Sequence, residues 1–381
     1  MVRIKLKYQS SVDVALLKYI IFQRGKMQNQ VIRCSKCVLP DTMPFVTFDN
    51  HGVCNYCNTY KSFKFQGEQE LLRILDLHRG ASKNYDCIVN ISGGRDSAYT
   101  LLKLKNDYGM RVLAVNYENP FTDDQAKKNI DNMVEVLKVN IIRFAHKSNI
   151  HESCFKNNLI SWFRHPSPAM VPMMCIGCKI IWKKILRIAK TYNIKLIING
   201  GNPYEYTSFK KELLDVSSNE PLTATYYKYG KGLVKKTLAN TSYLFPQYLP
   251  VLAKGFFYNN QYSIGSQLSG KNIKKIDLFH FIPWSESEII ARITNELYWD
   301  YPHELGSTWR FDCKIGHLKD YMYMTTLGMT EKDDFYAKMV REGLMTREQA
   351  LKRLNNENKI HPDIIRDIFR KSNLTPPKIS I

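Results

Sequence analysis

The sequence predicts an α/β protein built around a parallel β-sheet, with a cysteine-rich unit before the sheet and helices after it. Short apolar runs at residues 88–91, 111–115 and 139–144 alternate with segments of helical period. This alternation is typical of a parallel sheet that is covered by helices on both faces. Paired cysteines precede the first apolar run, and amphipathic segments continue towards the C-terminus.

The composition is that of an ordinary globular chain with a large excess of positive charge. The 381 residues are 44% hydrophobic, and 55 lysines and arginines against 35 acidic residues give a net charge of +20. This charge favours anionic partners such as nucleic acid, nucleotide-sugars or an acidic protein, without choosing among them. No run approaches the ~20 apolar residues of a membrane helix. Lys18 interrupts the apolar patch at 12–22, and no cleavage site follows it. We therefore expect a cytoplasmic protein without membrane insertion.

The first predicted unit is a zinc ribbon at residues 34–66, after an N-terminal extension at 1–33. Its four cysteines follow the spacing C-x2-C-x16-C-x2-C, which suits one zinc ion: Cys34, Cys37, Cys54 and Cys57. Paired cysteines in a chain of this size indicate metal binding in a reducing compartment rather than disulfides. Four thiolates leave no open position for water, so the zinc would be structural. The alternative is four reduced cysteines without a metal.

The second predicted unit, at residues 67–300, opens with a helix at 68–79 and a buried strand that runs directly into a glycine turn. Gly93 and Gly94 allow the backbone to approach a ligand closely, and the helix expected from Ser97 to residue 107 offers free N–H groups that favour phosphate. Ser92 and Ser97 add hydroxyl donors. A carboxylate at Asp96 would repel phosphates unless Mg²⁺ lay between them. Alternatively, Asp96 and Ser97 are plain helix caps.

Further polar or glycine residues follow later strands of the same unit. The remaining elements are predicted as a helix at 123–138, a helix at 179–192 and a strand at 195–198. Ligands in such sheets lie at the carboxyl ends of the strands. We therefore expect Asn116 and the Gly200–Gly201 turn near the ligand; the alternative for the two glycines is a tight turn without a ligand.

The rest of the chain is less regular. Residues 204–273 show no clean period and are predicted as an insertion of short helices over the ligand edge. Residues 275–283, with His280 among them, have strand character, and a capping box then opens a helix at 286–297. Residues 301–381 form a C-terminal helical region, with helices expected at 315–327, 331–342, 347–355 and 362–371.

A second cysteine pair, Cys175 and Cys178, lies just before the helix at 179–192. We do not expect a second closed zinc site, because only Cys154, Cys313 or a histidine remains to complete it. We expect the pair to shape its loop or to bind a metal together with Cys313. Asp312 and Lys314 flank Cys313 and are further candidate residues of the catalytic site.

The motifs resemble a known group of enzymes. The string from Ser92 to Ser97, Ser-Gly-Gly-Arg-Asp-Ser, resembles the loop of the PP-loop ATP pyrophosphatases, whose fold is HUP-like (adenine nucleotide alpha hydrolase-like). The order of the motifs along the chain is similar to that of the N-acetyl sugar amidotransferases of the WbpG and PseA type. The matching pieces are the Cys34–Cys57 cysteines, the 92–97 loop, Cys175-Ile-Gly-Cys178, Asn199-Gly-Gly-Asn-Pro203, Phe281-Ile-Pro-Trp284 and Asp312-Cys313.

The resemblance implies a reaction in surface-polysaccharide biosynthesis, such as that of lipopolysaccharide O-antigen or pseudaminic acid. ATP would adenylate the oxygen of a sugar N-acetyl group, ammonia would attack the activated carbon, and AMP would leave an acetamidino group. The substrate would be an N-acetylated nucleotide-sugar or a nonulosonic sugar. Ammonia would come from a HisH/HisF-like glutaminase and channelling partner, and nucleic acid is not expected as a partner.

The resemblance also implies roles for the site residues. Asp96 would hold Mg²⁺, and the pyrophosphate would lie against Ser92, Gly93, Gly94 and Ser97. Asn116, Gly200 and Gly201 would lie near the nucleoside. Asp312 would bind metal or handle a proton, and Lys314 would stabilise developing charge.

Two alternatives share some of these features. A tRNA 2-thiolation enzyme has the same loop, and some members hold an iron–sulfur cluster with a C-x2-C pair and a third cysteine, as Cys175, Cys178 and Cys313 could do. The positive charge would suit tRNA. A nucleic-acid-binding adaptor with a zinc ribbon is the second alternative, but the intact string at 92–97 argues against it.

Overall fold

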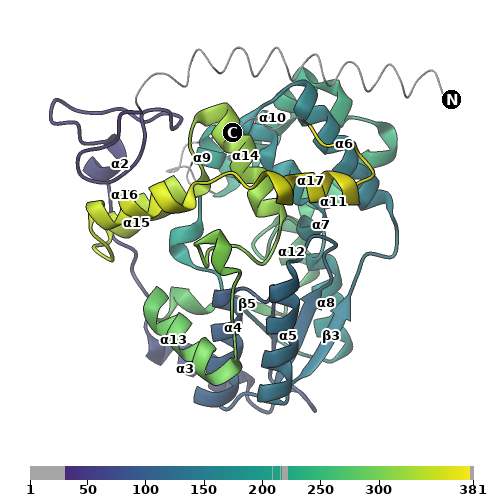
Figure 1. Cartoon of the computed structure of the whole chain (residues 1–381). Helices are drawn as coiled ribbons and strands as arrows, with labels where there is room; N and C mark the ends of the chain where they lie inside the picture. The colour runs from purple at the N-terminus through teal and green to yellow at the C-terminus, as the bar shows by residue number, and fades with distance from the viewer. Residues whose placement is uncertain (1–30, 208, 215, 217–221, 378–381) are drawn as a thin grey trace.

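A five-stranded parallel β-sheet lies at the centre of the α/β part of the computed structural model (Figure 1). The structure describes residues 31–207, 209–214, 216 and 222–377. Most of the predicted N-terminal extension therefore lies outside the described residues, as do the last residues of the C-terminal region and short parts of the predicted insertion.

The strands run in the order β3-β2-β1-β4-β5, and every neighbouring pair is parallel. Ile88 of the central strand pairs with Leu113 on one side and with Ile197 on the other. The predicted parallel sheet is thus confirmed, and its fifth strand comes from the region after the insertion, where strand character was expected. The strands are β1 (Cys87–Asn90), β2 (Val112–Tyr117), β3 (Asn140–Phe144), β4 (Leu196–Asn199) and β5 (Lys274–Asp277).

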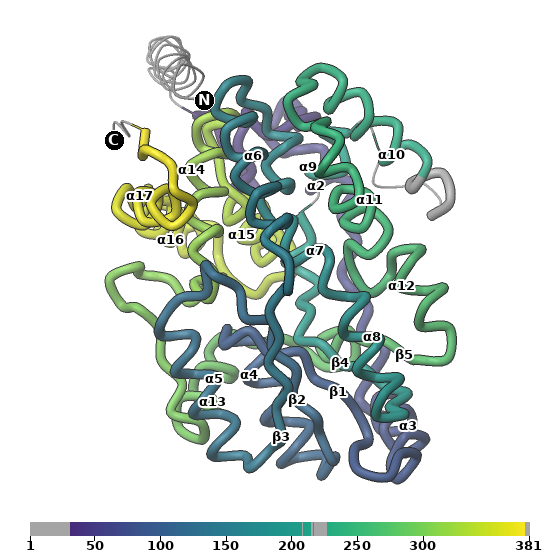
Figure 2. Tube along the Cα trace, turned by 90° about the vertical axis from the view of Figure 1, so that its right-hand side faces the viewer, coloured from purple at the N-terminus to yellow at the C-terminus, as the bar shows by residue number. Residues whose placement is uncertain are grey.

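Helices cover both faces of the sheet, as the strand sequences require. Alternate residues of the strands face opposite sides, so Ile88 packs with α8 (Trp182–Thr191) while Val89 belongs to the larger core on the other side. Figure 2 shows α4, α5 and α13 on that second side. Their bounds are α4 (Arg95–Leu102), α5 (Asp124–Leu137) and α13 (Glu286–Leu297), and α3 (Glu68–His78) precedes β1.

Two predicted elements differ from the structure. The strand expected at 275–283 ends at Asp277, and a short 3-10 helix, Leu278–His280, follows it, so the prediction that places His280 in a strand is wrong. Asp277 accepts hydrogen bonds from Gln261 and Tyr262, which fixes the strand end in a buried polar cluster. The helix expected at 179–192 corresponds to α8, which begins three residues later, at Trp182, and the separate short helix α7 (Ile176–Lys179) precedes it.

Helices make up the remainder of the described chain. The sequence did not indicate α6 (Ile150–Arg164) or the 3-10 helix Pro168–Cys175. The insertion contains α9 (Phe209–Glu212), α10 (Leu222–Ala239), α11 (Leu249–Phe257) and α12 (Ile264–Ser269). The predicted C-terminal helices are confirmed as α14 (Ile315–Leu327), α15 (Glu331–Arg341), α16 (Arg347–Glu357) and α17 (Pro362–Lys371). Within the described ranges, no helix is both long enough and apolar enough to cross a bilayer.

The cysteine-rich unit is held together by two isolated antiparallel bridges, Arg33 with Pro40 and Phe48 with Cys54, and by the short helix α2 (Asn55–Asn58). It lies against the C-terminal helices, as Figure 1 shows for α2, α15 and α16. Arg347 at the start of α16 donates through Nε to the carbonyl oxygens of Cys34 and Cys37, both at 3.0 Å. The first and last units of the chain are therefore neighbours in space.

Candidate functional site

The predicted phosphate loop leaves the carboxyl end of the central strand and folds back on itself. The Ser92 N–H donates to Ser97 Oγ at 3.2 Å, and Ser97 Oγ donates to the Gly94 carbonyl oxygen at 3.0 Å. Gly94 is the N-cap of α4, which starts at Arg95, two residues before the predicted start. Asp96 therefore lies in the first turn of the helix rather than ahead of it.

Gly93 is required by both the backbone and the packing of this loop. Its φ is +84°, and a Cβ on it would lie 2.1 Å from the carbonyl oxygen of Ala126 in α5. The loop is thereby pressed against α5, and the indole N–H of Trp299 donates to the Gly93 carbonyl oxygen at 3.0 Å.

Gly93→Ala is expected to lower the free energy of unfolding by about 3 kcal/mol or more, because the methyl group overlaps backbone atoms and the left-handed φ is strained. Gly306→Ala is the matched control. Gly306 also has a positive φ, +65°, but no atom lies within 4 Å of its added Cβ, so only the strain of about 1 kcal/mol remains. Equal losses in chemical denaturation would show that the contact with α5 does not matter.

Asp96 is held by two protein donors. Its Oδ1 accepts from Arg95 Nε at 2.9 Å and from the indole Nε1 of Trp284 at 3.1 Å. Arg95 is almost fully buried and also pairs with Glu286 at 2.6 Å and donates to Thr308 at 3.0 Å. The carboxylate is thus partly neutralised by a fixed cation, which the sequence did not reveal. Asp96 belongs to a buried ion network as well as to the loop.

Asp96→Asn is expected to destabilise the fold by about 2 kcal/mol, because it leaves buried Arg95 short of one charged partner. The matched control is Asp124→Asn, at an exposed pair with Lys127 on α5, where the loss should stay below about 0.5 kcal/mol. Thermal or chemical unfolding measures both. A loss for Asp96→Asn no larger than that of the control would contradict this account of the Arg95 pair.

Asp312 reaches the loop from the far end of the chain. The Asp123 N–H donates to the Asp312 carbonyl oxygen at 3.0 Å, and the Lys314 N–H donates to the Phe121 carbonyl oxygen at 2.9 Å. This short antiparallel contact lies beyond the end of β2. A Cβ on Gly94 would lie 3.2 Å from Cγ of Asp312. The contact therefore brings the Asp312 carboxyl group to the phosphate loop.

Burial raises the pKa of Asp312, and the neighbouring Asp96 raises it further, whereas Ser92 and Arg310 oppose the shift. The two carboxyl groups of the loop region thus repel one another. A divalent cation relieves such repulsion and prefers carboxylate oxygens, so the donor set fits Mg²⁺.

A cavity of about 180 Å³ opens beside Ser92 and Asp312 at the carboxyl ends of β1, β2 and β3. Its wall combines the apolar side chains Val115, Phe144, Ile181 and Ile185 with amide and thiol groups. Asn116, a predicted ligand residue, lines the cavity, and its Nδ2 donates to the Ile91 carbonyl oxygen at 2.9 Å. An apolar wall with a few converging polar groups is the usual character of a small-molecule site.

The Gly200–Gly201 turn packs behind the loop and is not part of this cavity wall. A Cβ on Gly200 would lie 2.6 Å from the Asp96 carbonyl oxygen, and a Cβ on Gly201 would lie 2.3 Å from Oδ1 of Asp277. Close packing therefore requires both glycines, in agreement with the alternative of a tight turn. Their predicted contact with the nucleoside stays a prediction.

Lys314 has a partner away from the loop. Its ammonium group pairs with Asp367 of α17 at 3.3 Å. We assign it no part in the proposed chemistry, although its backbone helps to position Asp312.

The second cysteine pair reaches the same cavity. Cys178 and Cys313 both line the wall, and Nδ2 of Asn119 lies 3.8 Å from the first sulfur and 3.3 Å from the second. Cys175 lies near enough that it contributes, after burial and Asp312, to raising the pKa of Cys313 to about 12. Tyr117, the last residue of β2, also lines the wall, and Asn119, two residues after it, is a wall residue that the sequence analysis missed. The position of Asn119 just after a strand end was the available signal.

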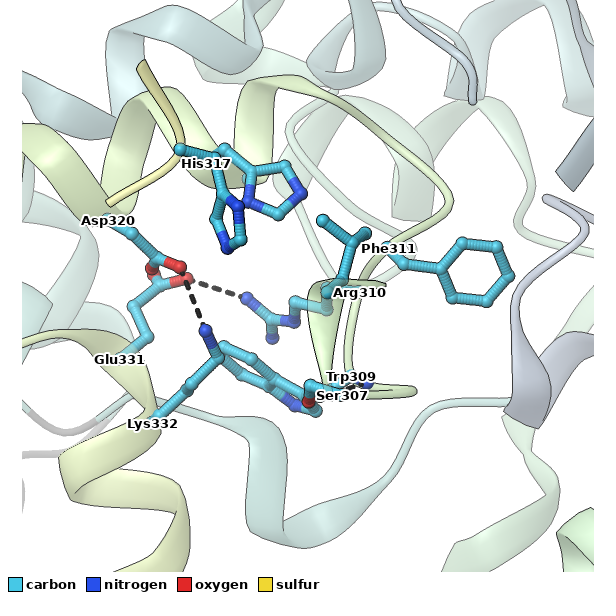
Figure 3. Close-up of a pocket in the computed structure, with 11 residues that line it drawn as sticks. Ser307, Trp309, Arg310, Phe311, His317, Asp320, Glu331 and Lys332 are labelled. Carbon is cyan, nitrogen blue, oxygen red and sulfur yellow. Dashed lines mark hydrogen bonds and ion pairs between the residues drawn. The ribbon is translucent and has the colours of Figure 1, made fainter. Parts of the chain in front are cut away.

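A much smaller cavity, of about 20 Å³, lies among charged residues near Trp309 (Figure 3). Arg310 pairs with Glu331 at 2.8 Å, and Lys332 pairs with Asp320 at 3.1 Å. The volume is that of about one water molecule, so this is an internal ion network and not a substrate site. Arg310 has a φ of +51°, which places a sharp turn just before Asp312.

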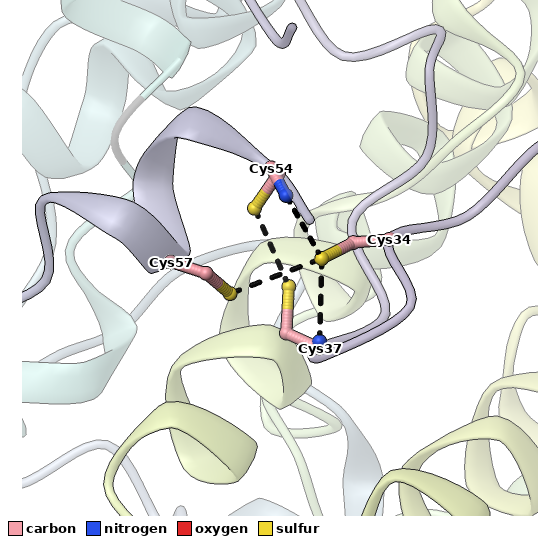
Figure 4. Close-up of side chains that lie close together, drawn as sticks. All are labelled: Cys34, Cys37, Cys54 and Cys57. Atoms are coloured by element: carbon pink, nitrogen blue, oxygen red, sulfur yellow. Dashed lines mark hydrogen bonds between the residues drawn. The ribbon is translucent and has the colours of Figure 1, made fainter. Parts of the chain in front are cut away.

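The four N-terminal cysteines converge as predicted (Figure 4). Their sulfurs lie within 4.8 Å of one another, with Cys37 to Cys54 at 3.7 Å and Cys34 to Cys57 at 3.9 Å. Sulfurs bound tetrahedrally to one zinc ion at 2.3 Å are roughly 3.8 Å apart. The buried guanidinium group of Arg341 donates to the sulfur of Cys37 at 3.6 Å, which would offset the negative charge of a four-thiolate centre. The cluster can hold one metal ion.

Comparisons with known proteins give distant likenesses. No family model matches the chain. An uncharacterized protein of Methanocaldococcus jannaschii is 24% identical over 187 residues, which are 47% of this chain and 63% of that protein, so the match spans less than two thirds of the relative. The U34-tRNA thiolase NcsA from Methanococcus maripaludis, solved with its [4Fe-4S] cluster, aligns over 83% of this chain and 89% of its own, with 16% identity and a TM-score of 0.32. NMN synthetase from Francisella tularensis aligns over 53% of this chain and 91% of its own, with 14% identity and a TM-score of 0.28. Likenesses at this level assign no function.

Proposed function

We propose that this chain is an ATP-dependent, AMP-forming enzyme that converts the N-acetyl group of a sugar into an acetamidino group. The observation that carries the proposal is the meeting of the 92–97 loop, Asp312 and a cavity at the carboxyl edge of the sheet. A glycine turn at a helix N-terminus suits a polyphosphate. The adjoining cavity suits the rest of a small substrate.

The convergence of distant motifs supports the finer part of the proposal. The pieces of sequence that resemble the N-acetyl sugar amidotransferases lie far apart in the chain, yet Cys178, Asp312 and the loop surround one cavity. The Gly200 turn and Trp284 pack directly against Asp96. One catalytic centre explains this arrangement more simply than several unrelated structural motifs.

The proposed chemistry proceeds in two steps. The amide oxygen of the substrate attacks the α-phosphorus of ATP, and pyrophosphate leaves. Ammonia then adds to the activated carbon and loses a proton, and AMP leaves with the former amide oxygen. The first step is necessary because an amide oxygen is a poor leaving group until it is adenylated.

The chain's own residues have separate tasks in these steps. The N–H and hydroxyl groups of the loop bind the pyrophosphate, and Asn116 fixes the loop through the Ile91 carbonyl oxygen. Asp312, whose pKa is raised by burial, is placed to take up the proton that ammonia loses. Asp96 would hold Mg²⁺, which neutralises phosphate charge when bound. Ammonia would be delivered by a separate HisH/HisF-like glutaminase.

The test is a measurement of AMP and pyrophosphate release with ATP, an ammonium salt and a panel of N-acetylated nucleotide-sugars and nonulosonic sugars. The proposal requires AMP formation that depends on both the sugar and ammonium. Formation of ADP and phosphate instead of AMP and pyrophosphate would contradict it, since that outcome means phosphorylation rather than adenylation.

A second candidate function, tRNA 2-thiolation, is favoured by one specific observation. Cys178 and Cys313 share the cavity wall with the loop, and Cys175 is nearby. In the part of the chain that the structure describes, these three sulfurs do not meet the 4.8 Å spacing that the N-terminal cysteines satisfy. An iron–sulfur cluster takes one thiolate on each of its ligated irons, so it does not require the three sulfurs to converge on a single ion.

Metal analysis of the purified protein separates the two functions. The amidotransferase proposal predicts one zinc per chain, held by the N-terminal cysteines, and no acid-labile sulfide. The thiolation alternative predicts iron and sulfide in addition, with visible absorption that disappears in Cys313→Ser. Cys87→Ser is the matched control, because Cys87 is a buried thiol in β1 that does not line the cavity.

A further inference from the structure

The positive charge of the chain is concentrated in two stretches that pack together. Residues 153–204 contain eight lysines and arginines and no acidic residue, and residues 221–276 contain eight lysines and no acidic residue. In the structure α8 contacts α12, and α11 contacts both α6 and α7. Figure 2 shows α10, α11 and α12 along one flank of the molecule, beside α8. We call these four helices the basic flank.

The outer face of α10 combines this charge with exposed apolar side chains. Tyr227, Val234 and Leu238 are 73%, 56% and 61% exposed and recur at helical spacing, so they form one ridge. The opposite face of α10 packs inward: a Cβ on Gly232 would lie 2.3 Å from the Leu214 carbonyl oxygen. The apolar ridge therefore points away from the protein.

A row of lysines runs beside the apolar ridge. Lys228, Lys231 and Lys235 are all exposed and also follow the helical period of α10. Around the helix axis these three positions lie on one side of the ridge, which is the arrangement of a helix that lies in a membrane interface. Further along the flank, Leu268 of α12 is the most exposed large apolar residue described, at 76%.

The type of apolar side chain distinguishes among anionic partners. Nucleic acid uses lysine and aromatic rings for phosphate contact and stacking, but it gains little from Val234, Leu238 and Leu268. An anionic lipid surface uses both the aliphatic side chains and the lysines. The aliphatic side chains enter the acyl boundary, while the lysines remain at the level of the lipid phosphates.

We propose that the basic flank docks peripherally on an anionic lipid bilayer, with the apolar ridge of α10 in the interface. The lysines and arginines of the two stretches without acidic residues attract the negative lipid headgroups. The apolar ridge adds binding free energy, because its side chains are buried in the membrane interface. This inference does not depend on the proposed reaction, because the residues of the ridge and of the lysine row are separate from the loop and its cavity.

The experiment is cosedimentation of the full chain with vesicles of phosphatidylcholine that contain phosphatidylglycerol, against vesicles of phosphatidylcholine alone. Two variants separate the contributions: Val234→Gln with Leu238→Gln removes the ridge, and Lys231→Gln with Lys235→Gln removes charge. Each substituted lysine near an anionic surface is worth roughly a fivefold change in affinity. We expect both double variants to bind the anionic vesicles at least tenfold more weakly than the unaltered chain.

Matched controls are Leu77→Gln on α3, whose side chain is 66% exposed, and Lys128→Gln with Lys352→Gln, both exposed on other helices. These variants should bind like the unaltered chain, and all variants should retain the unaltered circular dichroism spectrum. Absence of binding to the anionic vesicles would overturn the inference. Loss of binding in the lysine variant with full binding in the ridge variant would also overturn it. Such a result would indicate a purely electrostatic surface, and tighter binding to tRNA than to vesicles would then identify a nucleic-acid partner.

Discussion

Asp312→Asn is expected to reduce AMP release by roughly a thousandfold, the usual scale for loss of a proton-transferring or metal-binding carboxylate. The amide keeps the shape of the side chain and can still hydrogen-bond near Ser92. It cannot accept the proton that ammonia loses. The assay is ammonium- and sugar-dependent formation of AMP by the variant and by the unaltered chain.

The stability of the same variant should not fall. Burial raises the pKa of Asp312, so the ionised carboxylate is less favourable in the folded protein than in the unfolded chain. For an acid with a raised pKa in the folded state, stability is greatest at low pH and is lost as the pH rises through that pKa. The variant lacks this loss, and its advantage over the unaltered chain should therefore grow with rising pH.

Asp320→Asn is the control with the opposite signature. Asp320 is also a buried acid with a raised pKa, but it pairs with Lys332 in the small ion network. Its replacement leaves a buried lysine without its partner, so we expect lower stability and unaltered chemistry per folded molecule. A loss of AMP release as large as that of Asp312→Asn would show that the network, and not the loop, governs activity.

The double variant Cys34→Ser with Cys57→Ser should lose the bound metal and destabilise the N-terminal unit by at least about 3 kcal/mol, because metal binding contributes directly to folding free energy. The loss should extend to the C-terminal helices, since Arg341 and Arg347 bind the sulfur and carbonyl groups of this cluster. Metal content by mass spectrometry and thermal unfolding measure the two effects together.

Cys154→Ser is the control for the general cost of changing a buried cysteine. Cys154 is fully buried in α6, outside both cysteine groups. The Cys154→Ser variant should retain the full metal content and lose little stability. Full metal occupancy in the double variant would disprove the four-cysteine site.

The sequence predicted the parts of the molecule that depend on local patterns. Apolar runs and helical periods located all five strands, although the last ends earlier than predicted, and the C-terminal helices, and the C-x2-C spacing located the cysteine cluster. It did not predict the contact of Asp312 with Gly94, although it named both residues. That contact depends on the antiparallel pairing of 121–123 with 312–314 and on the positive φ of Arg310, and neither has a sequence period.

The environment of Asp96 also depends on contacts between distant segments that the sequence does not reveal. The residue types around it suggested an open phosphate site, but the carboxylate also pairs with Arg95, which is tied to Glu286 of α13 and, through Glu286, to Arg353 of α16. Long-range ion pairs leave no local signature. Likewise, Asn119 becomes a wall residue only because the turn after β2 faces Cys178 and Cys313.

The most direct test of the proposed function follows the oxygen atom of the substrate amide. An N-acetylated nucleotide-sugar that carries heavy oxygen in its acetamido carbonyl is incubated with the protein, ATP and an ammonium salt. The proposal predicts that AMP acquires the heavy oxygen in its phosphate while the sugar gains an amidine nitrogen. Heavy oxygen found in inorganic phosphate, or retained in the sugar while AMP forms without it, would contradict adenylation of the amide.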